Sequence, residues 1–183
     1  VLQGIICYTK HDYTNALSHL QRGFSSKHAD SDDIAGLQLV MGVIHLNMAQ
    51  SSTHQFLLLR EATNELAQAT EYYEIKKQTK EYSAAIGFLG YACFCMEAGN
   101  RQENIERAIF AFERALSTTT KNNDPEEWSM LQNDLGAAYL RRLSGNEATN
   151  RQRAYDAFTA ALSAATKDLY PVQWANIQNN LAS

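Results

Sequence analysis

Few residues in this sequence have the type and spacing that chemistry requires. The histidines do not show the His-Glu-x-x-His or comparable spacing of a zinc site; they are His11, His19, His28, His45 and His54. The sequence also has no glycine-rich phosphate loop, no Gly-x-Ser-x-Gly elbow and no catalytic cysteine signature. We therefore predict that the chain is not an enzyme and that it holds neither a cofactor nor a metal ion.

The cysteines lead to the same expectation. Cys93 and Cys95 lie two residues apart, and helical residues with this spacing do not face each other. A Cys-x-Cys pair is half of a metal site, but the sequence has no second pair, so we interpret both residues as buried thiols. The odd number of cysteines, with Cys7 as the third, disfavours a disulfide framework and favours a reducing, cytoplasmic location.

Composition narrows the class of protein. The 183 residues are 45% hydrophobic and include 2 prolines, which favours a folded, helix-rich chain. The net charge of −4 argues against nucleic-acid binding, which draws on an excess of Lys and Arg. No stretch approaches the roughly 20 apolar residues of a membrane span, and no signal peptide is visible. We expect neither nucleic-acid nor membrane partners.

A pattern of small and large apolar residues recurs along the chain at intervals of 46 residues. It reads Ala-x₃-Leu/Phe-x₂-Ala/Gly, and its spacing of four then three places the side chains on one helical stripe. An array of equivalent helical units repeats in this way, so the pattern favours binding over catalysis. Its positions are Ala16/Leu20/Gly23, Ala62/Leu66/Ala69, Ala108/Phe112/Ala115 and Ala154/Phe158/Ala161.

A second mark, Leu/Met followed by Gly/Ala, belongs to the other helix of each unit. The intervals between its second residues are 48, 46 and 46. A glycine in the middle of a helix costs about 1 kcal/mol relative to alanine, so its return indicates that two helices must approach closely. The mark occupies Met41-Gly42, Leu89-Gly90, Leu135-Gly136 and Leu181-Ala182.

These marks predict helices joined as hairpins. Complete repeats are expected at 31–77, 79–120 and 125–167, with half repeats at 1–27 and 171–183, together forming one helical repeat domain that continues in a longer natural protein. We expect Asp124 to cap the helix that Pro125 opens, and turns to form at Gly99-Asn100 and Gly145-Asn146. The predicted helices are 1–9, 12–27, 31–50, 56–77, 79–98, 102–120, 125–143, 148–167 and 171–183.

The two marks resemble the tetratricopeptide repeat, which carries Trp-x₂-Leu-Gly-x₂-Tyr on its first helix and Ala-x₃-Phe-x₂-Ala on its second. The resemblance implies an all-α fold, a right-handed superhelical α-solenoid of antiparallel helix hairpins with repeats of about 46 residues. It is carried best by Leu135-Gly136-x₂-Tyr139 followed by Ala154-x₃-Phe158-x₂-Ala161. The early repeats depart from it: Tyr82 stands in place of Trp128, Cys93 in place of Tyr139 and Thr70 in place of Leu116.

The lengthened repeat, strongest over residues 101–183, resembles the extended tetratricopeptide arrays of bacteria, especially multicellular cyanobacteria. Such arrays often precede a caspase-like protease domain of the CHAT type or a signalling NTPase module. The resemblance therefore implies a sensor or docking arm of a larger bacterial signalling or protease-effector protein.

In such a solenoid the first helices line a concave groove that takes a peptide or a partner helix. We expect Tyr91, Phe94 and Leu140 to anchor an apolar segment; alternatively, these positions pack against the lengthened helices or another part of the parent protein. The lysines of a carboxylate clamp are missing, so no clamp is expected. The predicted partner-binding residues are Leu39, Val43, Leu46, Gly87, Tyr91, Phe94, Asn133, Ala137, Leu140, Arg141 and Asn179.

Recurring amides on the first helices have their own explanation. Asn133 and Asn179 repeat at the interval of 46 residues, as do Gln132 and Gln178. Amides are mediocre helix formers, so the preferred explanation is that they form hydrogen bonds between successive repeats; contact with a ligand is the alternative.

The leading interpretation is a non-enzymatic protein–protein interaction scaffold. Its partner is another protein, a peptide or another domain of the same parent protein. Two alternatives remain open. One is a structural spacer or an array that self-associates end to end, and the other is the regulatory portion of an enzyme whose catalytic domain lies outside this chain.

Overall fold

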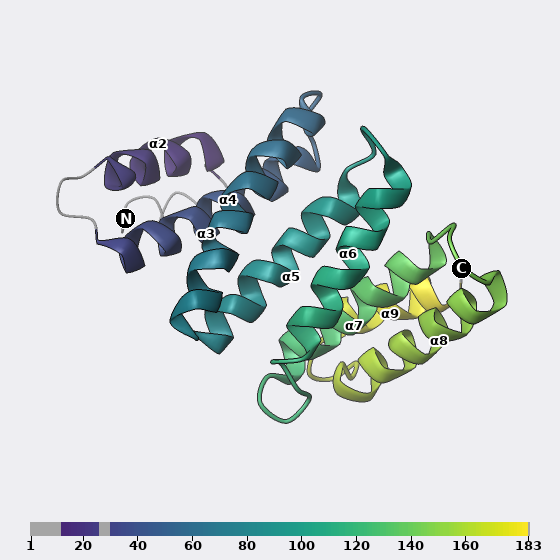
Figure 1. Ribbon diagram of the computed structural model, residues 1–183. Coiled ribbons are helices and arrows are strands. Elements are labelled where there is room, and N and C mark those ends of the chain that lie inside the picture. Colours follow the sequence, from purple (N-terminus) through teal and green to yellow (C-terminus); the bar gives the residue numbers. More distant parts are fainter. Residues whose placement is uncertain (1–11, 26–29, 183) are drawn as a thin grey trace. The chain divides into compact units, whose positions relative to one another are not determined.

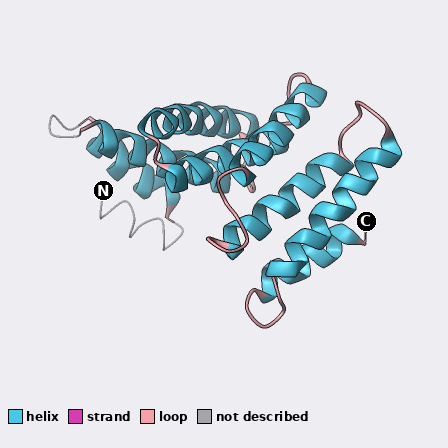
Figure 2. Ribbon diagram, turned by 60° about the horizontal axis from the view of Figure 1, so that its bottom comes forward, coloured by secondary structure: helices cyan, strands magenta, loops and turns pink. Residues whose placement is uncertain are grey.

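The computed structural model describes residues 12–25 and 30–182, and every regular element in these ranges is an α-helix (Figure 1, Figure 2). The all-α prediction is confirmed for this part of the chain, while the predicted helix at 1–9 lies outside the described residues. None of the described helices has the length and apolar character needed to cross a bilayer. The helices are α2 Tyr13–Phe24, α3 Ser31–Ala49, α4 Gln55–Lys76, α5 Thr79–Cys95, α6 Arg101–Leu116, α7 Pro125–Leu140, α8 Glu147–Ala164 and α9 Pro171–Leu181.

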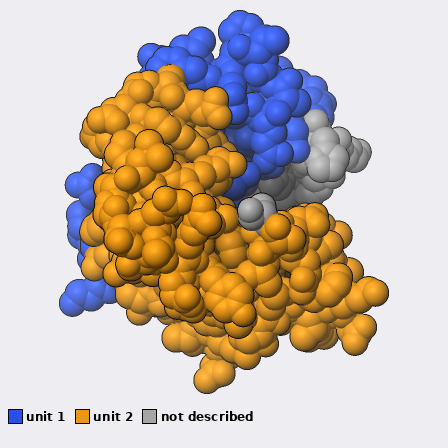
Figure 3. All heavy atoms as spheres, turned by 90° about the vertical axis from the view of Figure 1, so that its right-hand side faces the viewer, with its two compact units in different colours: residues 1–92 blue, residues 93–183 orange. Residues whose placement is uncertain are grey.

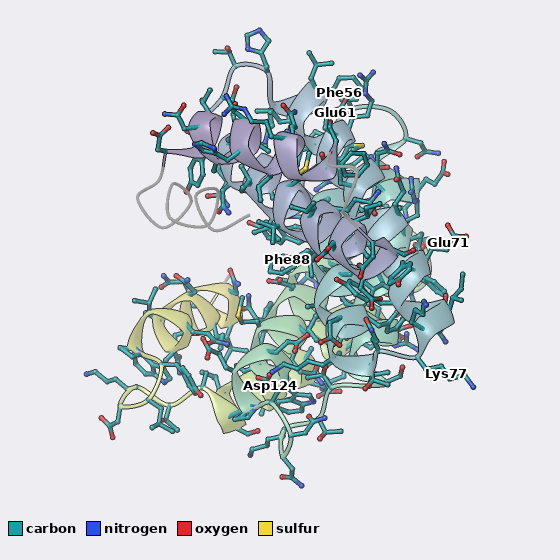
Figure 4. The ribbon with its side chains drawn as sticks, turned by 90° about the vertical axis from the view of Figure 1, so that its left-hand side faces the viewer. Phe56, Glu61, Glu71, Lys77, Phe88 and Asp124 are labelled. Carbon is teal, nitrogen blue, oxygen red and sulfur yellow. The ribbon has the colours of Figure 1, made fainter. Side chains whose placement is uncertain are left out.

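Each of these helices begins within one residue of its predicted start, and polar caps explain most of these starts. Asp124, labelled in Figure 4, accepts a hydrogen bond from the Glu127 amide at 3.1 Å, and Pro125 follows where no amide hydrogen is needed. Asp30 and Asp33 form a capping box at the start of α3, in which Asp30 Oδ1 accepts from the Asp33 amide at 2.8 Å. The predicted cap at Asp124 is thus confirmed.

The C-terminal ends of the helices were predicted one to four residues too late. In α6 the reason is visible after Leu116. The Ser117 hydroxyl donates to the Arg114 carbonyl at 2.6 Å, and the Thr118 hydroxyl donates to the Ala115 carbonyl at 3.0 Å. These side chains satisfy carbonyls that a further helical turn would otherwise use, so the helix ends there.

The chain forms two compact units, residues 1–92 and 93–183, which Figure 3 shows in different colours. In the first unit α3 packs against both α2 and α4. In the second unit α6 packs on α7, α7 on α8 and α8 on α9, and α7 also contacts α9. Apart from the contact between α7 and α9, these contacts join helices that are neighbours in the chain, as in an array of hairpins. The single domain and the right-handed solenoid remain predictions.

The marker glycines permit close approach within two hairpins. A Cβ atom added at Gly42 would lie 2.6 Å from Leu66 Cγ, and one added at Gly136 would lie 2.7 Å from Phe158 Cε1. Contacts this short are forbidden to real side chains, so the first helix meets the second through a bare backbone. The predicted need for close helix packing is confirmed at both positions.

The repeated stripe on the second helices is buried as predicted. Leu66, Phe112 and Phe158 are at most 1% exposed. Two residues that depart from the tetratricopeptide pattern are buried as well: Thr70 is 8% exposed and Cys93 is 3% exposed. The Thr70 hydroxyl donates a hydrogen bond to the Leu66 carbonyl at 2.7 Å. This bond allows a polar residue to occupy a buried, apolar position.

Candidate partner-binding surface

Two turns of residues 93–183 have the same construction. Gly99 and Gly145 both have a φ of +79°, a conformation that favours glycine over residues with a Cβ. The next residue in each turn, Asn100 or Asn146, caps the following helix with its side-chain oxygen. The predicted turns at Gly99-Asn100 and Gly145-Asn146 are therefore confirmed, with a shared physical reason.

A buried asparagine four residues further on closes each of these turns. Asn104 Nδ2 donates to the carbonyls of Met96 and Ala98 at 2.9 and 3.1 Å. Asn150 makes the equivalent bonds 46 residues later: it donates to the carbonyls of Arg142 and Ser144, at 3.4 and 2.8 Å. Each amide thus satisfies two carbonyls of the turn that follows the preceding helix.

The turn after α7 is held by a second network, which has no counterpart one repeat earlier. Arg142 donates to both carboxylate oxygens of Glu106 at 2.9 Å, and the Ser144 hydroxyl also donates to this carboxylate. The hydrogen bonds from Arg142 hold the pKa of the Glu106 carboxyl below its usual value. Gln102 accepts from the Leu143 amide at 3.1 Å. The turn is therefore fixed to α6 at three successive residues.

Arg141, in the same turn, lies over an aromatic ring and pairs with no acid among the described residues. Its guanidinium carbon is 4.4 Å from the centre of the Phe94 ring, a distance typical of a cation–π contact. The Arg101 guanidinium lies 5.8 Å from the same ring and donates to the Phe94 and Met96 carbonyls at 2.5 and 3.0 Å. Two positively charged guanidinium groups thus lie close to the Phe94 ring.

The structure brings together three predicted partner-binding residues in this unit. Phe94 and Arg141 are in contact, and Leu140 precedes Arg141 and is 43% exposed. Ala137 lies one turn before Leu140 on α7 and is partly buried. We name the surface formed by Phe94, Arg101, Leu140, Arg141 and Leu143 the arginine platform.

The predicted groove residues of the first unit are more enclosed. On α3, Leu46 is 4% exposed, while Leu39 and Val43 are partly buried. On α5, Gly87 is buried and Tyr91 is partly buried. Leu46 and Gly87 thus offer little surface to a partner in this conformation.

The predicted amide bonding between repeats occurs, but with a different partner. Asn180 Nδ2, on α9, donates to Asn133 Oδ1, on α7, at 2.9 Å. Asn133 donates in turn to Asp134 Oδ1 at 3.1 Å, while Asn179 is exposed. Burial raises the pKa of the Asp134 carboxyl from 3.8 to about 7, and the hydrogen bond from Asn133 opposes this rise. Asn133 thus serves a contact between α7 and α9.

In the first unit a histidine pairs with a carboxylate between α3 and α4. His45 Nδ1 lies 2.7 Å from Glu65 Oε2, and both side chains are mostly buried. Across residues 12–25 and 30–182, no three His, Cys, Asp or Glu side chains are grouped as metal ligands. His45 is therefore a polar residue of the hairpin interior with a hydrogen-bond partner.

A hollow of about 480 Å³ lies beside the start of α2 and the turn after α3. Its side chains already serve local structure: Asp12 accepts from the Asn15 amide, and the Ser52 hydroxyl oxygen accepts from the His54 amide at 3.0 Å. Among the described residues that line the hollow, no catalytic or metal-binding set is present.

Sequence reasoning missed three residues near the predicted groove. Leu143 is 83% exposed although its backbone is fixed, and Arg101 was not considered because it opens a second helix. Met130, 47% exposed, lies one turn before Asn133 on α7. Extending the predicted row of groove residues on α7 by one turn before Asn133 would have included Met130. No sequence signal marks Leu143, because it lies in a turn.

No protein-family model, no curated protein and no solved structure matches this chain. The repeat and the geometry of its hairpins are therefore the basis for any assignment of function.

Proposed function

We propose that this chain is a tetratricopeptide-like scaffold without catalytic activity, and that it binds a peptide or a partner helix along its first helices. In this proposal the hairpins continue one another as a right-handed solenoid, and α3, α5, α7 and α9 line its concave side. The chain acts as the sensor or docking arm of a larger bacterial signalling or protease-effector protein.

One observation carries the proposal: buried contacts recur from repeat to repeat, whereas the exposed Arg141 does not recur. Asn104 and Asn150 make the same bonds one repeat apart, and Gly42 and Gly136 play the same packing role. Arg141, in contrast, stands one repeat after Cys95 and has no repeated equivalent. A conserved internal scaffold with a changing surface is the arrangement by which repeat proteins present different binding surfaces.

A selection for binding peptides tests the proposal directly. The chain is immobilised and exposed to a displayed library of random dodecapeptides, and the dissociation constants of enriched peptides are measured by fluorescence anisotropy. The Tyr91→Ala/Phe94→Ala double variant should bind these peptides at least about tenfold more weakly, since buried aromatic anchors dominate such interfaces. Circular dichroism establishes that the variant remains helical and melts cooperatively.

The matched control removes two aromatic rings from second helices. Phe110 on α6 is 63% exposed and Tyr155 on α8 is 56% exposed. The Phe110→Ala/Tyr155→Ala variant should bind enriched peptides with unchanged affinity. If no peptide is enriched, or if both double variants lose affinity equally, binding along the first helices is refuted.

A further inference from the structure

The arginine platform has unused hydrogen-bonding capacity. Among the described residues Arg141 has no carboxylate partner, whereas Arg142 pairs with Glu106 and Arg151 pairs with Glu147. The Arg141 guanidinium lies over the Phe94 ring, and it makes no hydrogen bond or ion pair among the described residues, so its N–H groups can donate to a ligand. An arginine held in this way is prepared to bind a planar carboxylate through two parallel hydrogen bonds.

Two positive charges lie at the Phe94 ring of the platform. Arg101 lies on the same Phe94 ring, and its NH1 group is already bonded to backbone carbonyls, so it is fixed in place. The positive charges of Arg101 and Arg141 together attract an anionic ligand, while the charge of Arg142 is neutralised by Glu106. The local field therefore favours an anionic group over a neutral or cationic one.

Exposed leucines lie beside the arginine on a turn that is held rigidly. Leu140 directly precedes Arg141 and is 43% exposed, and Leu143, two residues later, is 83% exposed. The backbone of Leu143 is bonded to Gln102, and its neighbours Arg142 and Ser144 are bonded to Glu106. Since the turn is already ordered, a ligand that covers these leucines loses little free energy to ordering it.

We propose that the arginine platform binds an acidic side chain of a partner peptide, with a neighbouring aliphatic residue of that peptide packed on Leu140 and Leu143. The carboxylate pairs with Arg141 and is further attracted by Arg101. This inference rests on the proposed function, because it names the chemistry of the partner that the scaffold accepts. The platform recognises an internal Asp or Glu and does not require the terminal carboxylate of the partner.

The same peptide library tests the inference, with a second selection on the Arg141→Ala variant. Peptides enriched on the unchanged chain should contain Asp or Glu within four residues of Leu, Ile or Phe, and the variant should not enrich this class. The most enriched peptide, amidated at its C-terminus, serves as the anisotropy probe. Replacing its acid by the corresponding amide should weaken binding at least about tenfold, as should Arg141→Ala.

Matched variants separate the platform from general charge and general apolar surface. Arg151→Ala removes the same charge from an exposed position on α8, and Leu169→Ala removes a leucine that is 69% exposed. Both should leave the affinity within about twofold, while Leu143→Ala should lower it at least about fivefold. Arg141→Lys keeps the charge but not the flat, forked donor group, so it should not restore full affinity.

The outcomes distinguish the two levels of the proposal. If no peptide is enriched, the proposed function fails. If peptides are enriched but lack acids, or bind Arg141→Ala and the unchanged chain equally, the scaffold function stands and the inference about its partner is overturned. An equal loss with Arg151→Ala also overturns it, because diffuse charge would then explain the binding.

Discussion

The early hairpin of α3 and α4 and the late hairpin of α7 and α8 share one packing contact and differ in how their turns are held. In both, a marker glycine faces a large side chain of the second helix: Leu66 opposes Gly42, and Phe158 opposes Gly136. The same backbone approach thus accommodates an aliphatic side chain in one hairpin and an aromatic ring in the other.

The two turns use different hydrogen bonds. In the early hairpin, His54 precedes α4 without a side-chain cap, and its amide donates to the Ser52 hydroxyl oxygen at 3.0 Å. In the late hairpin Asn146 caps α8 and Asn150 satisfies two carbonyls of the turn. Leu58 stands one repeat before Asn104, so the early hairpin lacks the buried amide. The sequence repeats most evenly where turns depend on specific amides, because those bonds fix the turn length.

The strongest test of the shared contact removes the large side chain from each hairpin. Phe158→Ala should lower the free energy of unfolding by about 3–5 kcal/mol, because it leaves a cavity opposite Gly136. Leu66→Ala should cost less, about 2–4 kcal/mol, because a smaller group is lost. Denaturant unfolding followed by circular dichroism measures both values.

Tryptophan fluorescence adds a local reading to this experiment. Trp128 and Trp174 are the only tryptophans, and both belong to the unit of residues 93–183. The Phe158→Ala midpoint should therefore shift in fluorescence as well as in circular dichroism. A larger loss for Leu66→Ala than for Phe158→Ala would show that the two contacts do not scale with the size of the side chain.

A titratable residue in the late hairpin makes the comparison sensitive to pH. Asp134 lies two residues before Gly136, where the early hairpin has Val40 before Gly42. Burial raises its pKa from the ordinary 3.8 to about 7, so the folded chain binds the proton more tightly than the unfolded chain does. Its contribution to stability is therefore complete below about pH 4 and is lost as the pH rises to about 7.

Asp134→Asn should remove this loss, since asparagine does not ionise. The variant should exceed the unchanged chain in unfolding free energy by about 2–4 kcal/mol at pH 8 and show little gain at pH 4. Asn180, one repeat later, shows that an amide suits this position. Asp156→Asn makes the same change of acid to amide on the exposed face of α8 and is the matched control. A gain that is equal at both pH values would contradict the role of burial.

The smallest expected effect tests the glycines themselves. Gly42→Ala and Gly136→Ala should each lower the unfolding free energy by about 1–2 kcal/mol, because the cost of overpacking exceeds the gain in helix propensity. Gly136→Ala should cost more, since the Phe158 ring is stiffer than the Leu66 side chain. Melting temperatures by circular dichroism give the order.

Gly36 in α3 is a matched control for these substitutions. A Cβ atom there would meet only the Tyr73 hydroxyl oxygen, at 3.9 Å, which is an ordinary contact. Gly36→Ala should therefore stabilise the chain by up to about 1 kcal/mol. Stabilisation by all three replacements would show that the marker glycines are not required for close packing.

Sequence patterns were most informative where one residue type has one physical role. The marker glycines Gly42 and Gly136, the turn glycines Gly99 and Gly145 and the cap at Asp124 were assigned correctly, because each follows from local geometry. Helix ends were less predictable, since they depend on which hydroxyl or amide reaches a free carbonyl, as Ser117 and Asn104 do. The partner of Asn133 was missed for the same reason: Asn179 repeats its position, but Asn180 is the residue that reaches it.

The sequence by itself determined that this chain is helical, that its hairpins repeat every 46 residues and that certain glycines separate close helices. Periodicity and backbone sterics are local properties, and they can be read along the chain. Only the tertiary structure decided that Arg141 lies on Phe94 while Arg142 pairs with Glu106, although the two arginines are adjacent. Their different environments arise from residues 36 to 47 positions away, which no local pattern specifies.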